Sequence, residues 1–136
     1  MKSTIIEILQ QWQNEKIKLN PAASSELITR VEIEIGFSFP EEFEELYKQA
    51  NGFTDFDWRE NMFSIWPLER IFYEYNSSND KDFIGFSDFL INSHNIGFLK
   101  SQPGVFKNYA TNENIFVSES FIESIKLINS NSDLIY

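Results

Sequence analysis

The stretch "IEIGFSFPEEFEELYKQANGF", Ile33 to Phe53, contains the boundary signals of two successive helices. Gly36 follows an apolar helical pattern and can adopt the left-handed conformation that often ends a helix. Pro40 can occupy the first turn of a new helix, where its missing N–H costs little. Asn51-Gly52 can end that second helix, because both residue types tolerate positive φ. The stretch therefore predicts a helix, a short linker and a second helix.

Four glutamates lie in the helix predicted after Pro40, away from its apolar stripe. Phe43, Leu46 and Tyr47 recur at helical spacing, and we expect them to be buried. A negative charge near a helix N-terminus stabilises the helix by about 0.3–1 kcal/mol. Three interpretations remain open: help in starting the helix, solubility, or an acidic face for a partner. The glutamates are Glu41, Glu42, Glu44 and Glu45.

Two amphipathic helices are predicted before Gly36, and Asn20-Pro21 separates them. The first is expected to begin at Ser3 or Thr4, and the second at Ser24 or Ser25, because these hydroxyl residues can cap a helix. Apolar residues recur in both at the spacing of one helix face. They are Ile5, Ile8, Leu9 and Trp12 in the first helix, and Leu27, Ile28, Val31 and Ile35 in the second.

The sequence after Gly52 changes to short apolar runs bounded by turn residues, which predict strands. We expect Ser87-Asp88 and Ser93-His94-Asn95 to form turns, and residues 111–114 to form a loop. Leu68 to Tyr75 is predicted to be either a short helix or a strand. The expected strands cover residues 62–66, 83–86, 89–92, 96–100, 105–109 and 115–117.

A last helix is expected to begin near Ser118 or Ser120 and to bury Phe121, Ile122 and Ile125. Helices at the start, strands in the middle and one closing helix predict an α+β fold. In this fold the N-terminal helices and the C-terminal helix pack on a central, mainly antiparallel sheet. The length of 136 residues is that of one domain, which we expect to cover residues 1–136.

The charge of the chain is acidic and unevenly distributed. The net charge is −10 for the whole sequence, and −7 of it lies between Glu26 and Glu60. Direct nucleic-acid binding is disfavoured, because phosphate contacts need basic residues. A basic protein would instead be attracted. The sequence has no cysteine and shows no apolar run of signal-peptide or membrane-spanning length, so we expect a soluble cytoplasmic protein that does not bind a membrane.

The sequence offers little for catalysis. His94 is the one histidine and is expected at a surface turn. Asp55-x-Asp57-x-x-Glu60 superficially suggests a cation site but lacks the glycine and the distal glutamate of a calcium-binding loop. We therefore expect no catalytic residue, no cofactor and no metal site. A cryptic hydrolase or metal-dependent activity, centred on these acids or on Asp88, is a competing hypothesis.

The loop "FTDFDWRE", Phe53 to Glu60, mixes large aromatic residues with charged ones directly after a helix end. Phe56 and Trp58 either fold back into the core or stay outside. An exposed tryptophan beside an arginine and carboxylates has the composition of an interface anchor. The candidate partner-binding residues are therefore the four glutamates above together with Asp55, Asp57, Trp58, Arg59 and Glu60.

The order of these signals resembles the SUKH superfamily, which includes bacterial immunity proteins and Smi/Knr-type regulators. The likeness extends from Ser24 to Tyr136. It rests on acids before an aliphatic-Gly pair, an aromatic-Pro pair before a helix that ends in Asn-Gly, and later strand and helix motifs. The matching residues are Glu32, Glu34, Ile35-Gly36, Phe39-Pro40, Phe43 to Ala50, Asn51-Gly52, Ile65-Trp66-Pro67-Leu68, Phe86-Ser87-Asp88, Ser120 to Ile125 and Asp133-Leu134-Ile135-Tyr136.

The resemblance implies a non-enzymatic immunity protein that neutralises a cognate polymorphic or contact-dependent toxin by non-covalent binding. Nuclease-type toxin domains often carry basic clefts, so the implied partner is a basic protein toxin. The alternative is an intracellular scaffold or regulatory module with a partner that is not a toxin. The oligomeric state is left open by the sequence.

Overall fold

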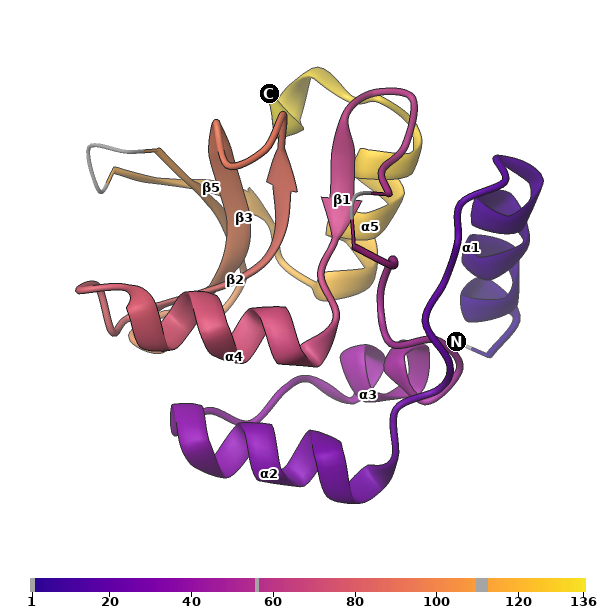
Figure 1. The fold of residues 1–136 in the computed structure, drawn as a ribbon. Helices are drawn as coiled ribbons and strands as arrows, with labels where there is room; N and C mark the ends of the chain where they lie inside the picture. Colours follow the sequence, from indigo (N-terminus) through magenta and orange to yellow (C-terminus); the bar gives the residue numbers. More distant parts are fainter. Residues whose placement is uncertain (1, 56, 110–112) are drawn as a thin grey trace.

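The computed structural model describes residues 2–55, 57–109 and 113–136 (Figure 1). Its centre is a sheet of five antiparallel strands in the order β1-β2-β3-β4-β5, so each strand pairs with its neighbour along the chain. The strands are β1 (Phe63–Ile65), β2 (Phe83–Phe89), β3 (His94–Leu99), β4 (Val105–Asn108) and β5 (Asn114–Ser118).

Helices surround this meander, which confirms the predicted α+β fold. They are α1 (Lys2–Asn14), α2 (Ser25–Ile35), α3 (Glu41–Tyr47), α4 (Leu68–Ser77) and α5 (Phe121–Asn129), with a final 3-10 turn, η1 (Asp133–Ile135). Figure 1 shows α4 beside β2, α2 beyond α4, and α1 at the edge of the molecule. Helix α5 contacts β5 and α3.

An aromatic cluster joins the helices to one face of the sheet. The rings of Phe43 and Tyr47 on α3 are stacked at 4.0 Å, and Phe121 on α5 lies 5.0 Å from Phe86 on β2. The Tyr47 hydroxyl donates a hydrogen bond of 2.5 Å to the Trp66 carbonyl, and burial raises the pKa of this phenol. The predicted stripes of the first two helices are confirmed, with Leu9 and Leu27 at their half-buried margins.

The boundary signals of the opening stretch are largely confirmed. Ser24 caps α2, since its hydroxyl accepts a hydrogen bond of 3.1 Å from the Leu27 N–H, and Gly36 ends the helix at φ 68°. Helix α3 begins directly after Pro40 but ends at Tyr47, earlier than the Asn51-Gly52 signal predicted. The reason is that the Tyr47 carbonyl accepts from the Ala23 N–H at 2.9 Å instead of from a donor four residues on. Helix α1 begins at Lys2, just before its predicted cap.

Asn51 and Gly52 position the start of the next helix, α4, rather than the end of α3. The Asn51 side-chain oxygen accepts from the Leu68 N–H at 2.8 Å, and its nitrogen donates to Glu69 at 2.9 Å, so Asn51 caps α4. Gly52 has φ 68°, and a Cβ there would lie 2.6 Å from the carbonyl carbon of Trp66. This pair therefore fixes where α4 starts against the sheet.

Three predictions for the sheet were wrong in detail. Residues 83–89 form one strand, in which Ser87 donates a 2.6 Å bond to the Ser64 carbonyl and Asp88 is buried. The chain reverses at residues 90–93, where a strand was expected. His94 is a buried strand residue and not a surface turn: its Nε2 lies 2.8 Å from the Ile135 carbonyl oxygen, and burial lowers its pKa. Between the two predicted alternatives, the stretch from Leu68 is a helix.

The loop before β1 runs along the outer edge of that strand. The Phe53 N–H donates to the Ile65 carbonyl and the Arg59 N–H to the Phe63 carbonyl, both at 2.8 Å. These backbone bonds resemble strand pairing and hold the loop at the side of the sheet. Of the predicted features, Phe56 and the loop residues Thr111 and Asn112 lie outside the described residues.

Candidate functional site

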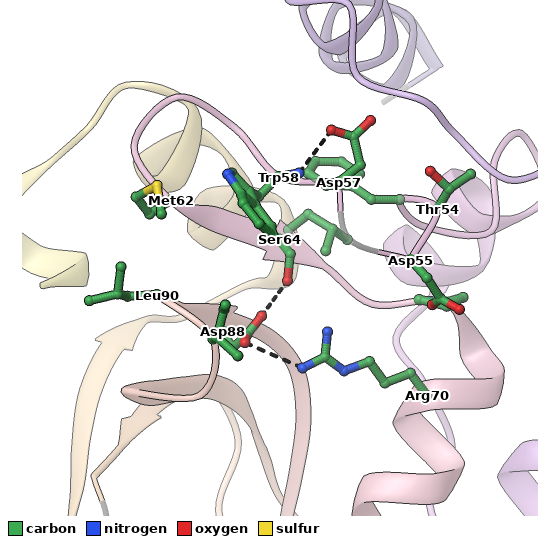
Figure 2. Close-up of a pocket in the computed structure, with 13 residues that line it drawn as sticks. Thr54, Asp55, Asp57, Trp58, Met62, Ser64, Arg70, Asp88 and Leu90 are labelled. Atoms are coloured by element: carbon green, nitrogen blue, oxygen red, sulfur yellow. Dashed lines mark hydrogen bonds and ion pairs between the residues drawn. The ribbon is translucent and has the colours of Figure 1, made fainter.

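A cavity of about 280 Å³ opens between the loop before β1 and the turn between β2 and β3 (Figure 2). We call it the loop–turn hollow. The loop contributes Asp55, Asp57, Trp58 and Met62, and the turn contributes Leu90 and Ile91. Ser64, Asp88 and Arg70 line its inner side, where Figure 2 shows Asp88 between Ser64 and the guanidinium of Arg70.

Asp88 organises the inner side of the hollow. Its Oδ1 accepts hydrogen bonds from the Ser64 hydroxyl and, at 2.9 Å, from the Trp66 indole N–H. Its Oδ2 accepts from the Asn92 backbone N–H at 2.7 Å and from Arg70 at 3.3 Å. Four donors match the acceptor capacity of a carboxylate. Asp88 is therefore a buried structural acid that joins β1, α4 and the turn.

Arg70 connects this network to α4. Its guanidinium lies over the Trp66 ring, 4.4 Å from the ring centre, and its Nε is 3.7 Å from Glu74. Trp66 is buried and does not line the hollow, whereas Arg70 does. The guanidinium therefore both contacts the Trp66 ring and borders the hollow.

The turn after β2 has an unusual backbone. Leu90, Ile91 and Asn92 have φ values of 49°, 53° and 65°. The left-handed conformation costs about 1–2 kcal/mol per residue, and it is most unusual for a β-branched residue such as Ile91. Leu90 and Ile91 are nevertheless 46% and 72% exposed. Backbone strain that presents apolar side chains to solvent is typical of functional sites.

Hydrogen bonds to backbone atoms hold this turn. Asp88 accepts from the Asn92 N–H, the Leu90 N–H donates to the Met62 carbonyl at 3.0 Å, and the Ser93 N–H donates to the Phe89 carbonyl at 2.9 Å. The contact with Met62 also ties the turn to the loop before β1. The two walls of the hollow are therefore fixed to each other.

The predicted loop residues lie in this site to different degrees. Asp57 accepts from the Lys18 N–H at 2.6 Å and from the Trp58 N–H at 3.0 Å, so it also anchors the loop to the segment after α1. Trp58 is 38% exposed and lines the hollow, and Asp55 is exposed and lines it as well. Glu60 is exposed on the turn that leads into β1 and does not line the hollow.

Arg59 is turned into the protein. Only 6% of it is exposed, and its guanidinium makes a bidentate pair with Glu15, directly after α1, at 2.8 and 2.9 Å. It also donates to the Ile128 carbonyl at 2.7 Å and to the Asn129 carbonyl at 3.2 Å, at the end of α5. Arg59 therefore fastens α1 to α5 and has little surface left for a partner.

The four glutamates of α3 lie apart from the hollow. Glu41 is exposed, and Glu44 and Glu45 are half-buried. Glu42 accepts a 3.3 Å bond from the Ile122 N–H, so it serves the first turn of α5. Among the described residues that line the hollow, none is one of these glutamates. The structure thus brings Asp55, Asp57 and Trp58 together and leaves the α3 acids as a separate group.

Sequence reasoning missed the residues that complete the site. Arg70 belongs to no distinguishing motif. Leu90 and Ile91 were missed because a turn with three positive φ values normally contains glycine, and this turn has none. Asp88 was noticed as turn material, as a possible catalytic acid and as part of the Phe86-Ser87-Asp88 motif of the resemblance, but not as a residue of the site. A carboxylate flanked by the apolar residues of a strand was the one available signal that the chain needed a buried partner there.

Two features were looked for in the described residues, a metal-binding cluster and a membrane-spanning helix. Across residues 2–55, 57–109 and 113–136, His, Asp and Glu side chains do not gather in threes with the spacing that would hold a metal ion. In the same part of the chain, every helix is too short or too polar to cross a membrane.

The chain matches the model of a known protein family. The sequence model of the SMI1 / KNR4 family (SUKH-1) matches residues 22–132, which include α2 to α5, all five strands and every residue of the hollow named above. A search of curated proteins found none that matches the chain.

Proposed function

Because the chain belongs to the SMI1 / KNR4 family (SUKH-1), we propose that it is an immunity protein that binds a cognate toxin. Family membership is consistent with a function of this type and with a non-enzymatic interaction domain. In our proposal the partner is a basic, nuclease-type toxin domain. The protein blocks it by non-covalent contact in the cytoplasm and does not transform a substrate.

The observation that carries the proposal is the exposed apolar surface beside the loop–turn hollow. Trp58, Leu90 and Ile91 are large, exposed and held on a fixed backbone. Protein interfaces combine an apolar centre with a polar rim, and buried anchors supply most of their binding energy. The rigid turn reduces the entropy lost on binding, because its conformation is already set.

Charge supports a basic partner. Asp55 and Asp57 line the hollow, Glu60 follows them on the surface, and the whole chain carries −10. Complementary charge speeds association, whereas buried contacts slow dissociation. We assign the slow dissociation to the apolar residues and the fast capture to the acids. The separate glutamates of α3 add to the long-range negative field, and Arg59 is left out of the proposed interface.

Co-expression with a candidate toxin gene taken from the same locus tests this function. We expect growth to be restored and the two proteins to elute from gel filtration as one complex. Continued killing without a complex would refute the proposal.

A matched pair of variants tests the site. Ile91→Asn removes the exposed apolar side chain, and asparagine tolerates the positive φ of this position. Ile33→Asn is the control, because Ile33 is 74% exposed on α2. We expect the first variant to weaken complex formation at least about tenfold, as for a hot-spot residue, and the second to leave it unchanged. Equal effects would move the interface away from the hollow.

A further inference from the structure

We propose that the loop–turn hollow receives one aromatic side chain of the partner, and that basic residues flank this aromatic residue in the partner's sequence. This inference rests on the proposed binding function and specifies the partner's recognition element. It is carried by the stacking of Arg70, the size and lining of the hollow, and the charges at its rim.

Arg70 provides a surface for an aromatic ring. A guanidinium is planar and has two faces that can stack on aromatic rings. The guanidinium carbon of Arg70 lies over the Trp66 ring, 4.4 Å from the ring centre, and the side chain also lines the hollow. Asp88 at 3.3 Å and Glu74 at 3.7 Å fix the orientation of the group. A ring entering the hollow can therefore complete a stack of Trp66, Arg70 and ligand.

The dimensions and lining suit one ring. An apolar protein cavity of about 150 Å³ holds a benzene molecule, and the hollow measures about 280 Å³. The space fits a phenol or an indole with its connecting carbon. Trp58, Met62 and Leu90 supply apolar walls on the sides away from Arg70. An aliphatic side chain would fill less of this space and gain nothing from the guanidinium.

The rim sets the charge of the flanking residues. Asp55 and Asp57 both line the hollow, while the charge of Arg70 is offset by its pairing with Asp88. Asp55 and Arg70 also line a wider, neighbouring groove of about 820 Å³, which adds the exposed acid Glu69. A partner segment that continues from the hollow into this groove passes the carboxylates of Asp57 and Asp55 in the hollow and of Glu69 in the groove. Basic neighbours are favoured there and acidic ones are repelled.

Short capped peptides can test the inference without any toxin. The probes are acetyl-Arg-Trp-amide, acetyl-Arg-Leu-amide, which lacks the ring, and acetyl-Glu-Trp-amide, which reverses the charge. Binding is followed by NMR on the whole isotope-labelled protein at millimolar peptide. We expect Arg-Trp to shift the indole N–H of Trp58, the Nε–H of Arg70 and the amides of Leu90 and Ile91. Its affinity should exceed that of each control peptide by about threefold to tenfold.

Two variants assign the effect to the named groups. Arg70→Lys keeps the charge but removes the planar group, so the preference for Arg-Trp over Arg-Leu should decrease. Arg30→Lys, on an exposed part of α2, is the matched control and should preserve it. Asp55→Asn should reduce the preference for Arg-Trp over Glu-Trp. If Arg70→Lys does not fold, as judged by circular dichroism, the three peptides with wild-type protein and with Asp55→Asn still decide.

The inference is overturned if the shifts do not localise to the hollow, or if Arg-Leu or Glu-Trp binds as tightly as Arg-Trp. Its failure can be separated from failure of the proposed function. Restored growth with no peptide preference would leave the immunity function and remove the aromatic anchor. A clear peptide preference without any rescue of growth would keep the recognition element and assign it to a partner that is not a toxin.

Discussion

Replacement of Arg59 by methionine should destabilise the fold far more than replacement of any exposed arginine. Methionine keeps the unbranched apolar stem and removes the guanidinium. The loss removes one of the bridges between α1 and α5, because Arg59 pairs with Glu15, just after α1, and with the Ile128 and Asn129 carbonyls at the end of α5. Removal of one partner from a buried ion pair typically costs about 3–5 kcal/mol.

The structure places the expected cost at the lower end of this range. The Glu15 side chain is 27% exposed, so water can reach it after the loss of Arg59. The Ile128 carbonyl also accepts from Asn61 at 3.0 Å, and the Asn129 carbonyl accepts from Gln11 at 3.0 Å. These carbonyls would keep one donor each. We therefore expect a loss of about 3 kcal/mol in the free energy of unfolding, which corresponds to a fall in Tm of roughly 10 °C for a chain of this size.

The pH dependence of this loss gives a second readout. Burial by itself raises the pKa of Glu15, but hydrogen bonds from Arg59 and Gln11 and the charge of Arg59 outweigh it and lower the pKa below its ordinary 4.5. A lowered pKa in the folded state contributes stability above the ordinary pKa, and this stability is lost as the pH falls through the folded value. The difference between wild type and Arg59→Met should therefore be largest near neutral pH and shrink in acid.

Urea unfolding followed by circular dichroism measures both effects. Arg30→Met, on the exposed side of α2, is the matched control and should change stability by less than about 0.5 kcal/mol. Glu15→Gln in each background completes a double-mutant cycle that isolates the pair. If Arg59→Met costs no more than Arg30→Met, or if its cost does not change with pH, the assignment of Arg59 as the link between α1 and α5 is wrong.

Three further predictions follow from particular backbone positions and charges. Gly52→Ala should cost more than about 2 kcal/mol in unfolding free energy, because it combines positive φ with a backbone clash, whereas Gly36→Ala meets only the side-chain Nζ of Lys100 at 3.3 Å and should cost about 1 kcal/mol. Similar values for both variants would contradict the clash. Ile91→Gly should raise the stability by about 0.5–1 kcal/mol through relief of strain while weakening partner binding, and a loss of stability in thermal melts would argue against strain in the turn. Replacement of the α3 acids Glu41, Glu44 and Glu45 by lysine should slow the association of a basic toxin and flatten the salt dependence of its rate in stopped-flow measurements. If the association rate does not change, these acids serve only the helix.

The features that sequence predicted well depend on neighbours in the chain. The start of α2 follows from the hydroxyl of Ser24, three residues from the N–H that it accepts, and its end follows from Gly36 alone. The order of β2 to β5 as a meander follows from short connections. In each case the deciding contact lies within a few residues, so the local pattern contains the information.

The features that sequence did not predict depend on partners far along the chain. Ser87-Asp88 stays within a strand because Ser64, Trp66 and Arg70 satisfy the buried carboxylate. Arg59 is internal because it meets Glu15, which lies 44 residues earlier, directly after α1. A local pattern shows a charged or turn-forming residue in both cases, and only the folded arrangement shows which donor or acceptor it meets.

The turn after β2 separates support from recognition. The bonds that hold it are made by the main-chain N–H groups of Leu90, Asn92 and Ser93, and the side chains of Leu90 and Ile91 take no part in them. Substitution at positions 90 and 91 can consequently alter what the surface recognises while the scaffold beneath keeps its shape. The domain can thus acquire a different binding specificity through changes at these two positions alone.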